Sequence, residues 1–272
     1  MSMKSINSEI KGVYHLNLLA EHIAKDIFLV GDQGRVSEIS KRFDSIEHKI
    51  SNREFTTHTG YIGSKRVSAL STGIGTDNID IVLNELDSLV PKSESLNLIR
   101  LGTSGTIQKD IDIDSLIVST HGLGIDNLMH FYANNQFDDD LQKAINEQLE
   151  WPKELSVPYI YAANKQLLSK FSDLRSGITV TAPGFYAPQG RKLRLPFAIE
   201  DLHQRLKSFE HKGLRITNFE METSALYGLG KLMGHNCLTI CTILANRATG
   251  GKSTDYKSAI DNMIDTVLGK LY

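Results

Sequence analysis

Cysteine is scarce in this sequence of 272 residues, which contains only Cys237 and Cys241. Two cysteines are too few for a disulfide framework, and their scarcity is typical of a protein from a reducing compartment. The spacing in the segment CLTIC places both side chains on one face of a strand, where we expect two buried thiols. Because no other ligand lies near them in the sequence, we expect no metal site there.

The sequence also lacks a long apolar run and an excess of charge of either sign. Nowhere do about 18 apolar residues follow one another, and the first residues hold no apolar stretch of signal-peptide length. The 30 lysines and arginines nearly balance 32 aspartates and glutamates, so the formal net charge is −2. A protein that binds a nucleic-acid backbone normally carries a basic excess. We therefore expect a cytoplasmic protein that binds neither nucleic acid nor a membrane.

Short β-branched segments alternate with amphipathic segments along the chain, a pattern typical of α/β proteins. Buried strands are predicted at residues 27–30, 96–101, 115–120, 177–182 and 237–245. Apolar residues at helical spacing predict helices that include residues 79–90, 225–233 and 260–271. Since no linker, internal repeat or low-complexity tract divides the chain, we expect one domain over residues 1–272.

Two nucleotide-binding motifs are excluded by single residues. The segment GKS at 251–253 resembles the end of a Walker A loop, but Asn246 occupies the position of its first glycine. The segment STGIGTDN at 71–78 has Asn78 where a dinucleotide-binding fingerprint needs its third glycine.

Glycine and arginine recur where the predicted strands end, in the segments 27–36, 69–78 and 98–107. Exposed backbone N–H groups beside a guanidinium suit a phosphate. Arg100 lies inside an apolar strand, so its charge requires an anion or a carboxylate. Glu220 and Glu222 open a predicted helix. They either stabilise its first turn, or Glu222 faces a cleft and accepts hydrogen bonds from a sugar diol.

Taken together and in this order, these segments resemble the uridine phosphorylase branch of the hexameric-type nucleoside phosphorylases. The matching segments are GDQGR at 31–35, REFTT at 53–57, STGIG at 71–75, RLGTSG at 100–105, EME at 220–222 and NR at 246–247. The resemblance extends from His15 to Arg247. It implies a three-layer α/β fold in which helices flank a central mixed, twisted sheet or distorted barrel.

The family catalyses reversible phosphorolysis, in which orthophosphate replaces the base at the anomeric carbon of ribose. The resemblance therefore implies a pentosyltransferase of pyrimidine salvage that converts uridine to uracil and ribose 1-phosphate, with orthophosphate as co-substrate and no cofactor. It also implies a homo-oligomer, a dimer or a hexamer, with active sites shared between subunits. Some relatives hold a potassium ion through the glutamate equivalent to Glu54. Because Asn78 replaces the companion serine, we expect no metal here.

The resemblance also assigns roles to individual residues. The implied phosphate contacts are Gly31, Arg35, Arg53, Arg100 and Thr103. The implied ribose contacts are His15, Thr103, Met221 and Glu222. The implied base contacts are Phe185, Gln189, Arg191 and Arg247. Among these residues, the side chains implied in catalysis are Arg100, Glu222 and Arg247, and those that reach a neighbouring subunit's site are His15 and Arg53.

The chemistry needs no protein nucleophile, because phosphate supplies the attacking oxygen and the transition state is oxocarbenium-like. Glu222 suits the sugar hydroxyls, and Gln189 and Arg191 suit the donor and acceptor pattern of a pyrimidine edge. Purine-specific relatives protonate the base with an aspartate in the region of Asn246, which disfavours that route here. Three alternatives stay open: a purine nucleoside phosphorylase, a nucleosidase of the same fold, and a catalytically silent nucleoside-binding protein.

Overall fold

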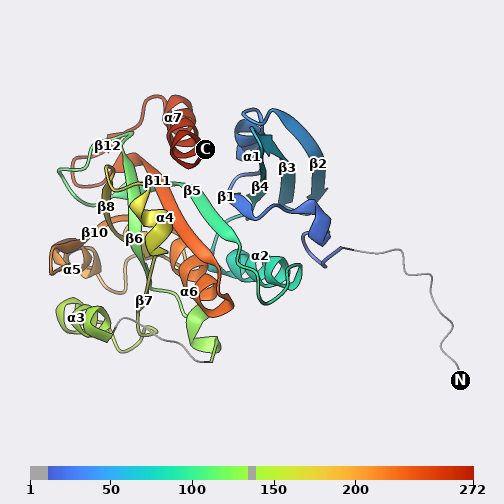
Figure 1. Cartoon of the computed structure of the whole chain (residues 1–272). Helices are drawn as coiled ribbons and strands as arrows, with labels where there is room; N and C mark the ends of the chain where they lie inside the picture. The colour runs from blue at the N-terminus through green and yellow to red at the C-terminus, as the bar shows by residue number, and fades with distance from the viewer. Residues whose placement is uncertain (1–11, 134–138) are drawn as a thin grey trace, which may run out of the picture.

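The computed structural model describes residues 12–133 and 139–272 (Figure 1). Its strands are β1 (Asp26–Val30), β2 (Ser45–Asn52), β3 (Phe55–Ile62), β4 (Lys65–Ser71), β5 (Asn97–Thr106), β6 (Leu116–Gly124), β7 (Tyr159–Ala162), β8 (Arg175–Thr181), β9 (Glu210–His211), β10 (Leu214–Glu220), β11 (Asn236–Asn246) and β12 (Gly251–Lys252). Its α-helices are α1 (Gln33–Ser40), α2 (Thr76–Ser88), α3 (Asp139–Leu149), α4 (Lys165–Ser169), α5 (Leu202–Ser208), α6 (Thr223–Met233) and α7 (Tyr256–Leu271).

The strands form one mixed sheet that closes on itself at β5. The sheet order is β12-β11-β6-β8-β10-β5-β1-β4-β3-β2, and β5 pairs in addition with β11. The strands β5, β11, β6, β8 and β10 therefore form a ring, from which β1 to β4 extend as an open sheet. Helices flank this sheet, with α1 beside β2 to β4 and with α3 and α5 at the other end of the molecule (Figure 1). The expected α/β fold with a distorted barrel is confirmed.

The five predicted strands and three predicted helices are all present, because each has a clear apolar pattern. Residues 27–30 of β1 are completely buried, and β1 is parallel to both β4 and β5, as expected for a continuous apolar strand. The sequence patterns predicted only the end of β4, at 69–71, and missed β2, β3, β7, β9, β10 and β12. The β2 segment SIEHKISN has no buried side chain and lies at the sheet edge, so packing imposes no apolar alternation on it.

The parallel strands β1, β4, β5 and β11 bring their carboxyl ends to one edge of the sheet. In such α/β sheets ligands bind in the crevice outside these ends. The loop between β4 and α2 turns sharply there, since Gly73 and Gly75 adopt positive φ angles of 71° and 101°.

Among residues 12–133 and 139–272, no helix is both long and apolar enough to cross a membrane. The cytoplasmic location and the single domain stay predictions.

Candidate active site

A cavity of about 930 Å³ opens at this edge of the sheet, a size typical of small-molecule sites. The predicted site residues that line it are Gly31, Arg35, Arg100, Thr103, Phe185, Gln189, Arg191, Met221 and Glu222. Residues up to 191 positions apart in the sequence thus share one cavity. Three predicted residues, His15, Arg53 and Arg247, are not part of its lining.

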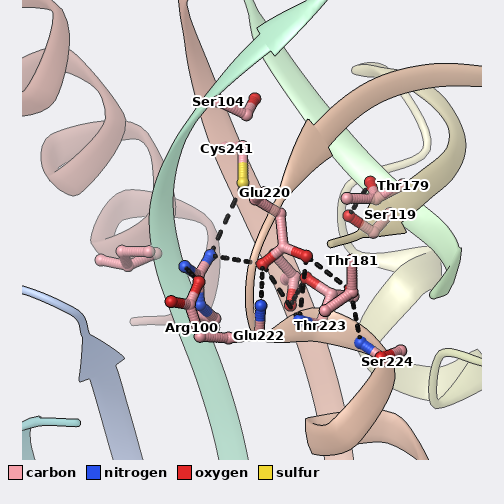
Figure 2. Close-up of polar contacts among 12 residues, drawn as sticks. Arg100, Ser104, Ser119, Thr179, Thr181, Glu220, Glu222, Thr223, Ser224 and Cys241 are labelled. Atoms are coloured by element: carbon pink, nitrogen blue, oxygen red, sulfur yellow. Dashed lines mark hydrogen bonds and ion pairs between the residues drawn. The ribbon is translucent and has the colours of Figure 1, made fainter. Parts of the chain in front are cut away.

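Arg100 is the most deeply buried cation of the cavity, with 4% of its surface exposed. Its guanidinium forms ion pairs with Glu222 and, at 3.3 Å, with Glu220 (Figure 2). Burial lowers the pKa of Arg100, but the two carboxylates raise it further, so the net shift is upward and the side chain stays charged. The carboxylates thus supply the compensation that a charge inside an apolar strand requires. The Nε atom of Arg100 is buried and has no hydrogen-bond partner in the described part of the chain.

Glu220 stabilises the start of α6. Its carboxylate accepts hydrogen bonds from the backbone N–H groups of Glu222 at 2.9 Å and Thr223 at 3.0 Å, and from the Thr181 hydroxyl at 2.6 Å. The Thr181 hydroxyl in turn accepts the N–H of Ser224 at 2.8 Å (Figure 2). Of the two interpretations of the carboxylate pair, stabilisation of the first helical turn therefore applies to Glu220, because its carboxylate accepts the backbone N–H groups there.

Glu222 bridges two segments of the cavity wall, and only 3% of it is exposed. One carboxylate oxygen contacts Arg100, and the other accepts the backbone N–H of Gly75 at 2.9 Å. The carboxylate is therefore fixed from both sides before any ligand is bound.

Arg35 brings a second guanidinium into the cavity. Its Nη1 donates to the carbonyl of Leu101 at 3.1 Å. Burial and then the charge of Arg100 lower the pKa of Arg35. Two like charges in one cavity wall, next to Gly31 and Thr103, favour a bound anion that reduces their repulsion.

The opposite end of the cavity is organised around the amide of Gln189, which is 2% exposed. Its Oε1 accepts hydrogen bonds from Arg191 at 2.5 Å and from Arg247 at 2.7 Å. Its Nε2 makes no hydrogen bond to any residue that the structure describes. The Arg191 guanidinium lies 3.7 Å from the ring centroid of Phe185. The two arginines therefore fix which way the Gln189 amide faces.

Arg247 acts on this end through Gln189, because it does not itself line the cavity. Its guanidinium lies 4.9 Å from the ring centroid of Phe219, which does line it. Burial and then Arg191 lower the pKa of Arg247 to about 10. Within the described chain neither arginine forms an ion pair with a carboxylate.

His15 and Arg53 lie together but outside this cavity. Asn52 donates to the carbonyl of His15 at 2.7 Å, and the Arg53 guanidinium lies 5.4 Å from the ring centroid of Tyr14, which is 75% exposed. Arg53 occupies the β2–β3 turn with a positive φ of 54°. Such a conformation is uncommon for a residue with a side chain.

Asn246 has a structural role. Its Nδ2 donates to the carbonyls of Gln108 and Ile111, and its Oδ1 accepts the N–H groups of Ala248 and Thr249. The side chain is buried and is not part of the cavity lining, so it is not positioned to protonate a base.

The two cysteines are free and buried, as expected, and burial raises the pKa of Cys241 to about 12. In the ranges 12–133 and 139–272 there is no group of three or more His, Cys, Asp or Glu side chains that could hold a metal ion.

Among the residues that the sequence interpretation gave no site role are Gly75 and Phe219, and it did not foresee the arginine contact of Glu220. A signal existed for two of these features. Gly75 belongs to a glycine-rich segment after a strand, and Glu220 lies two positions from Glu222. No sequence pattern indicates Phe219, since its place in the cavity wall arises from tertiary packing.

The fold and this cavity define an α/β protein with a small-molecule site at the carboxyl ends of its strands. The sequence profile of the phosphorylase superfamily matches residues 25–267, and the chain belongs to this family.

Similar proteins cover most of the chain. A uridine phosphorylase of Thermococcus kodakarensis is 29% identical over 258 aligned residues, in an alignment that covers 91% of this chain and 83% of that protein. A uridine phosphorylase of Haemophilus influenzae is 27% identical over 88% of each chain. A DeoD-type purine nucleoside phosphorylase of Bacillus mycoides is 28% identical over 93% of this chain and 96% of that protein.

Solved structures agree with the fold. A nucleoside phosphorylase of Trypanosoma brucei, described as showing uridine phosphorylase activity, has a TM-score of 0.88 and 26% identity, over 97% of this chain and 98% of that one. A purine nucleoside phosphorylase of Toxoplasma gondii has a TM-score of 0.71 at 20% identity and supports the fold alone.

Proposed function

We propose that this chain is a uridine phosphorylase, which cleaves uridine with orthophosphate to give uracil and ribose 1-phosphate and needs no cofactor. One observation carries the proposal. A single cavity has the guanidiniums of Arg35 and Arg100 beside Glu222 at one end, and at the other end the Gln189 amide, whose oxygen accepts hydrogen bonds from two arginines. The relatives that are named uridine phosphorylases, and the T. brucei structure, support the same activity.

Phosphate binds at Gly31, Arg35, Arg100 and Thr103. The mutual repulsion of the two arginines is relieved by an anion in this position. Phosphate held there attacks the anomeric carbon, so the arginines contribute positioning as well as charge.

Ribose binds beside phosphate, at Met221, Thr103 and Glu222. Glu222 accepts hydrogen bonds from the sugar hydroxyls, which strengthen as positive charge develops on the ring. Because Arg100 and Gly75 already fix the carboxylate, little reorganisation is needed during the reaction.

The base binds at Phe185, Gln189 and Arg191. The Nε2 of Gln189 and the Arg191 guanidinium donate to uracil oxygens and stabilise the negative charge that develops as the base leaves. Arg247 supports this through the Gln189 oxygen that it holds. Phe185, 49% exposed, covers the open side of the base.

The active unit is an oligomer in which His15 and Arg53 complete the site of a neighbouring subunit. Their common location outside their own cavity supports this arrangement, with Arg53 exposed and His15 half-buried against Glu85. A strictly monomeric and active preparation would contradict it.

The test is uridine consumption with and without orthophosphate, with uracil and ribose 1-phosphate measured together and inosine assayed in parallel. We expect uracil release that depends on phosphate, with little hypoxanthine from inosine. Uracil release without phosphate would instead indicate a nucleosidase, preferential inosine cleavage would indicate a purine enzyme, and silence on both nucleosides would indicate a binding protein.

A further inference from the structure

His203, on α5, lies directly behind the base end of the cavity. Its ring is nearly parallel to that of Phe219, at 9°, with the centroids 5.1 Å apart. Phe219 lines the cavity, and the guanidinium of Arg247 lies over the same ring. The imidazole therefore contacts the cavity wall through Phe219 but does not itself line the cavity.

The same imidazole also contacts the chain segment that presents Gln189 and Arg191. Gly190, between them, adopts a positive φ of 65°. A Cβ atom on Gly190 would lie 2.4 Å from the His203 ring, so only glycine allows this close approach. Both the Phe219 ring and the backbone at Gly190 thus pack against the His203 ring.

The imidazole is uncharged near neutral pH. Burial, and then the charges of Arg247 and Arg191, lower the pKa of His203 to about 4. Its Nε2 is buried and has no hydrogen-bond partner in the described part of the chain. A flat, neutral ring can pack beside two guanidiniums that form no carboxylate ion pair, whereas another cation would be repelled.

We propose that His203 is a positioning residue for the base: its ring fixes Phe219 and the Gln189–Arg191 segment, and so sets the geometry in which the base is bound. This inference rests on the proposed function, since it concerns the same base end of the cavity. His203 itself does not touch the base, because it does not line the cavity.

The substitution His203→Ala removes the ring and leaves Phe219 and Gly190 without their support. We expect the Kd for uracil and the KM for uridine to rise about tenfold, the size of effect that loss of about one hydrogen bond to the base produces. The KM for orthophosphate should change by less than about twofold. The phosphate contacts Arg35, Arg100 and Thr103 belong to a different set of elements.

His203→Phe tests whether the ring is what matters. Phenylalanine keeps a flat ring against Phe219 but removes both nitrogens, so it should restore most of the uracil affinity. His235→Ala is the matched control for loss of a buried histidine. His235 is 7% exposed and accepts the N–H of Leu96, and it is not part of the cavity lining.

The experiment measures uracil and orthophosphate binding by calorimetry, together with initial rates and thermal unfolding, for the wild type and these three variants. Weak uracil binding in His203→Ala alone, with normal phosphate binding, supports the inference. Unchanged uracil binding in His203→Ala, equal weakening for both ligands, or a His203→Phe variant as poor as His203→Ala overturns it. If the wild type binds uracil but turns over no uridine, the proposed function fails while the binding data still decide the role of His203. If the wild type does not bind uracil, both fail.

Discussion

The two ends of the cavity balance their charges in different ways. At the proposed sugar–phosphate end, Arg100 within β5 is held by Glu220 at the end of β10 and by Glu222 at the start of α6, and all three side chains are almost completely buried. At the base end, Arg191 and Arg247 share a single amide oxygen of Gln189 and form no carboxylate ion pair in the described chain.

This difference indicates how each end responds to loss of a side chain. Removing one member of a buried ion pair leaves an uncompensated charge, which costs both stability and function. Removing Arg191 or Arg247 relieves the repulsion between the two guanidiniums and mainly costs hydrogen bonds to Gln189 and the ligand. Substitutions at the proposed sugar–phosphate end should therefore lower both stability and activity strongly, whereas those at the proposed base end should lower chiefly the binding of the nucleoside.

The largest effect is expected for Arg100→Met. Glu220 and Glu222 lose their buried partner, so the free energy of unfolding should fall by about 3–5 kcal/mol, and activity should fall by at least about 100-fold. Urea unfolding and initial rates measure the two effects. Lys143→Met, which removes the exposed ion pair with Glu147 on α3, is the control and should cost less than about 1 kcal/mol. Wild-type stability in Arg100→Met would remove the contrast between the two ends.

Gln189→Ala should have a smaller and more selective effect. Loss of the amide removes a charge-assisted contact worth about 1.5–3 kcal/mol, so kcat/KM for uridine should fall by about one to two decades. The KM for orthophosphate should stay within about twofold. The free energy of unfolding should fall by about 1–3 kcal/mol, because Arg191 and Arg247 lose the acceptor that they share. Unaltered uridine turnover would show that the base is not bound by this amide.

Gly75→Ala tests how the backbone supports Glu222. Alanine is strained at a φ of 101°, which should cost about 1–2 kcal/mol and displace the N–H that holds the carboxylate. Gly213→Ala is the control, since Gly213 has a φ of 79° and open space around its Cβ position. Both variants should lose similar stability by urea unfolding, but only Gly75→Ala should lose activity. Equal activity in the two would contradict the positioning of Glu222 by Gly75.

The smallest effect concerns pH and the base end. The pKa of His203 is lowered to about 4 in the folded protein, against about 6.5 when unfolded. The unfolded chain therefore binds the proton more tightly, and stability contributed by neutral His203 is lost as pH falls from about 6.5 toward 4. Between pH 7.5 and pH 5 the wild type should lose about 1–2 kcal/mol more unfolding free energy than His203→Phe. Parallel losses in the two proteins would show that His203 is not shielded from protonation.

The two ends also differ in how much of them the sequence predicts. The proposed sugar–phosphate end depends on short motifs, such as Arg100 within β5 and Glu222 at the start of α6. The glycine loop expected after Arg100 is wrong, because β5 continues through residues 102–105 to Thr106 and pairs there with β11. Apolar strands that carry such residues can be recognised, because burial of a charge signals a need for a partner. For Arg100 the sequence predicted only that this partner is an anion or a carboxylate, not which residue supplies it.

The base end depends more on tertiary packing, and less of it follows from local pattern. The resemblance assigned Gln189, Arg191 and Arg247, but neither spacing nor periodicity links residue 203 to residue 219. The hairpin that carries Arg53 was missed because its edge strand is polar. These contacts exist only once distant segments fold together, so single-sequence patterns do not contain them.

The most direct test of the account is a crossed measurement of KM in Arg35→Ala and Arg191→Ala, with uridine and orthophosphate varied in turn. If the cavity binds phosphate at one end and the base at the other, Arg35→Ala raises chiefly the KM for phosphate and Arg191→Ala chiefly the KM for uridine. If both variants raise the same KM, or if uridine cleavage in the wild type does not depend on orthophosphate, the assignment of the two ends is wrong.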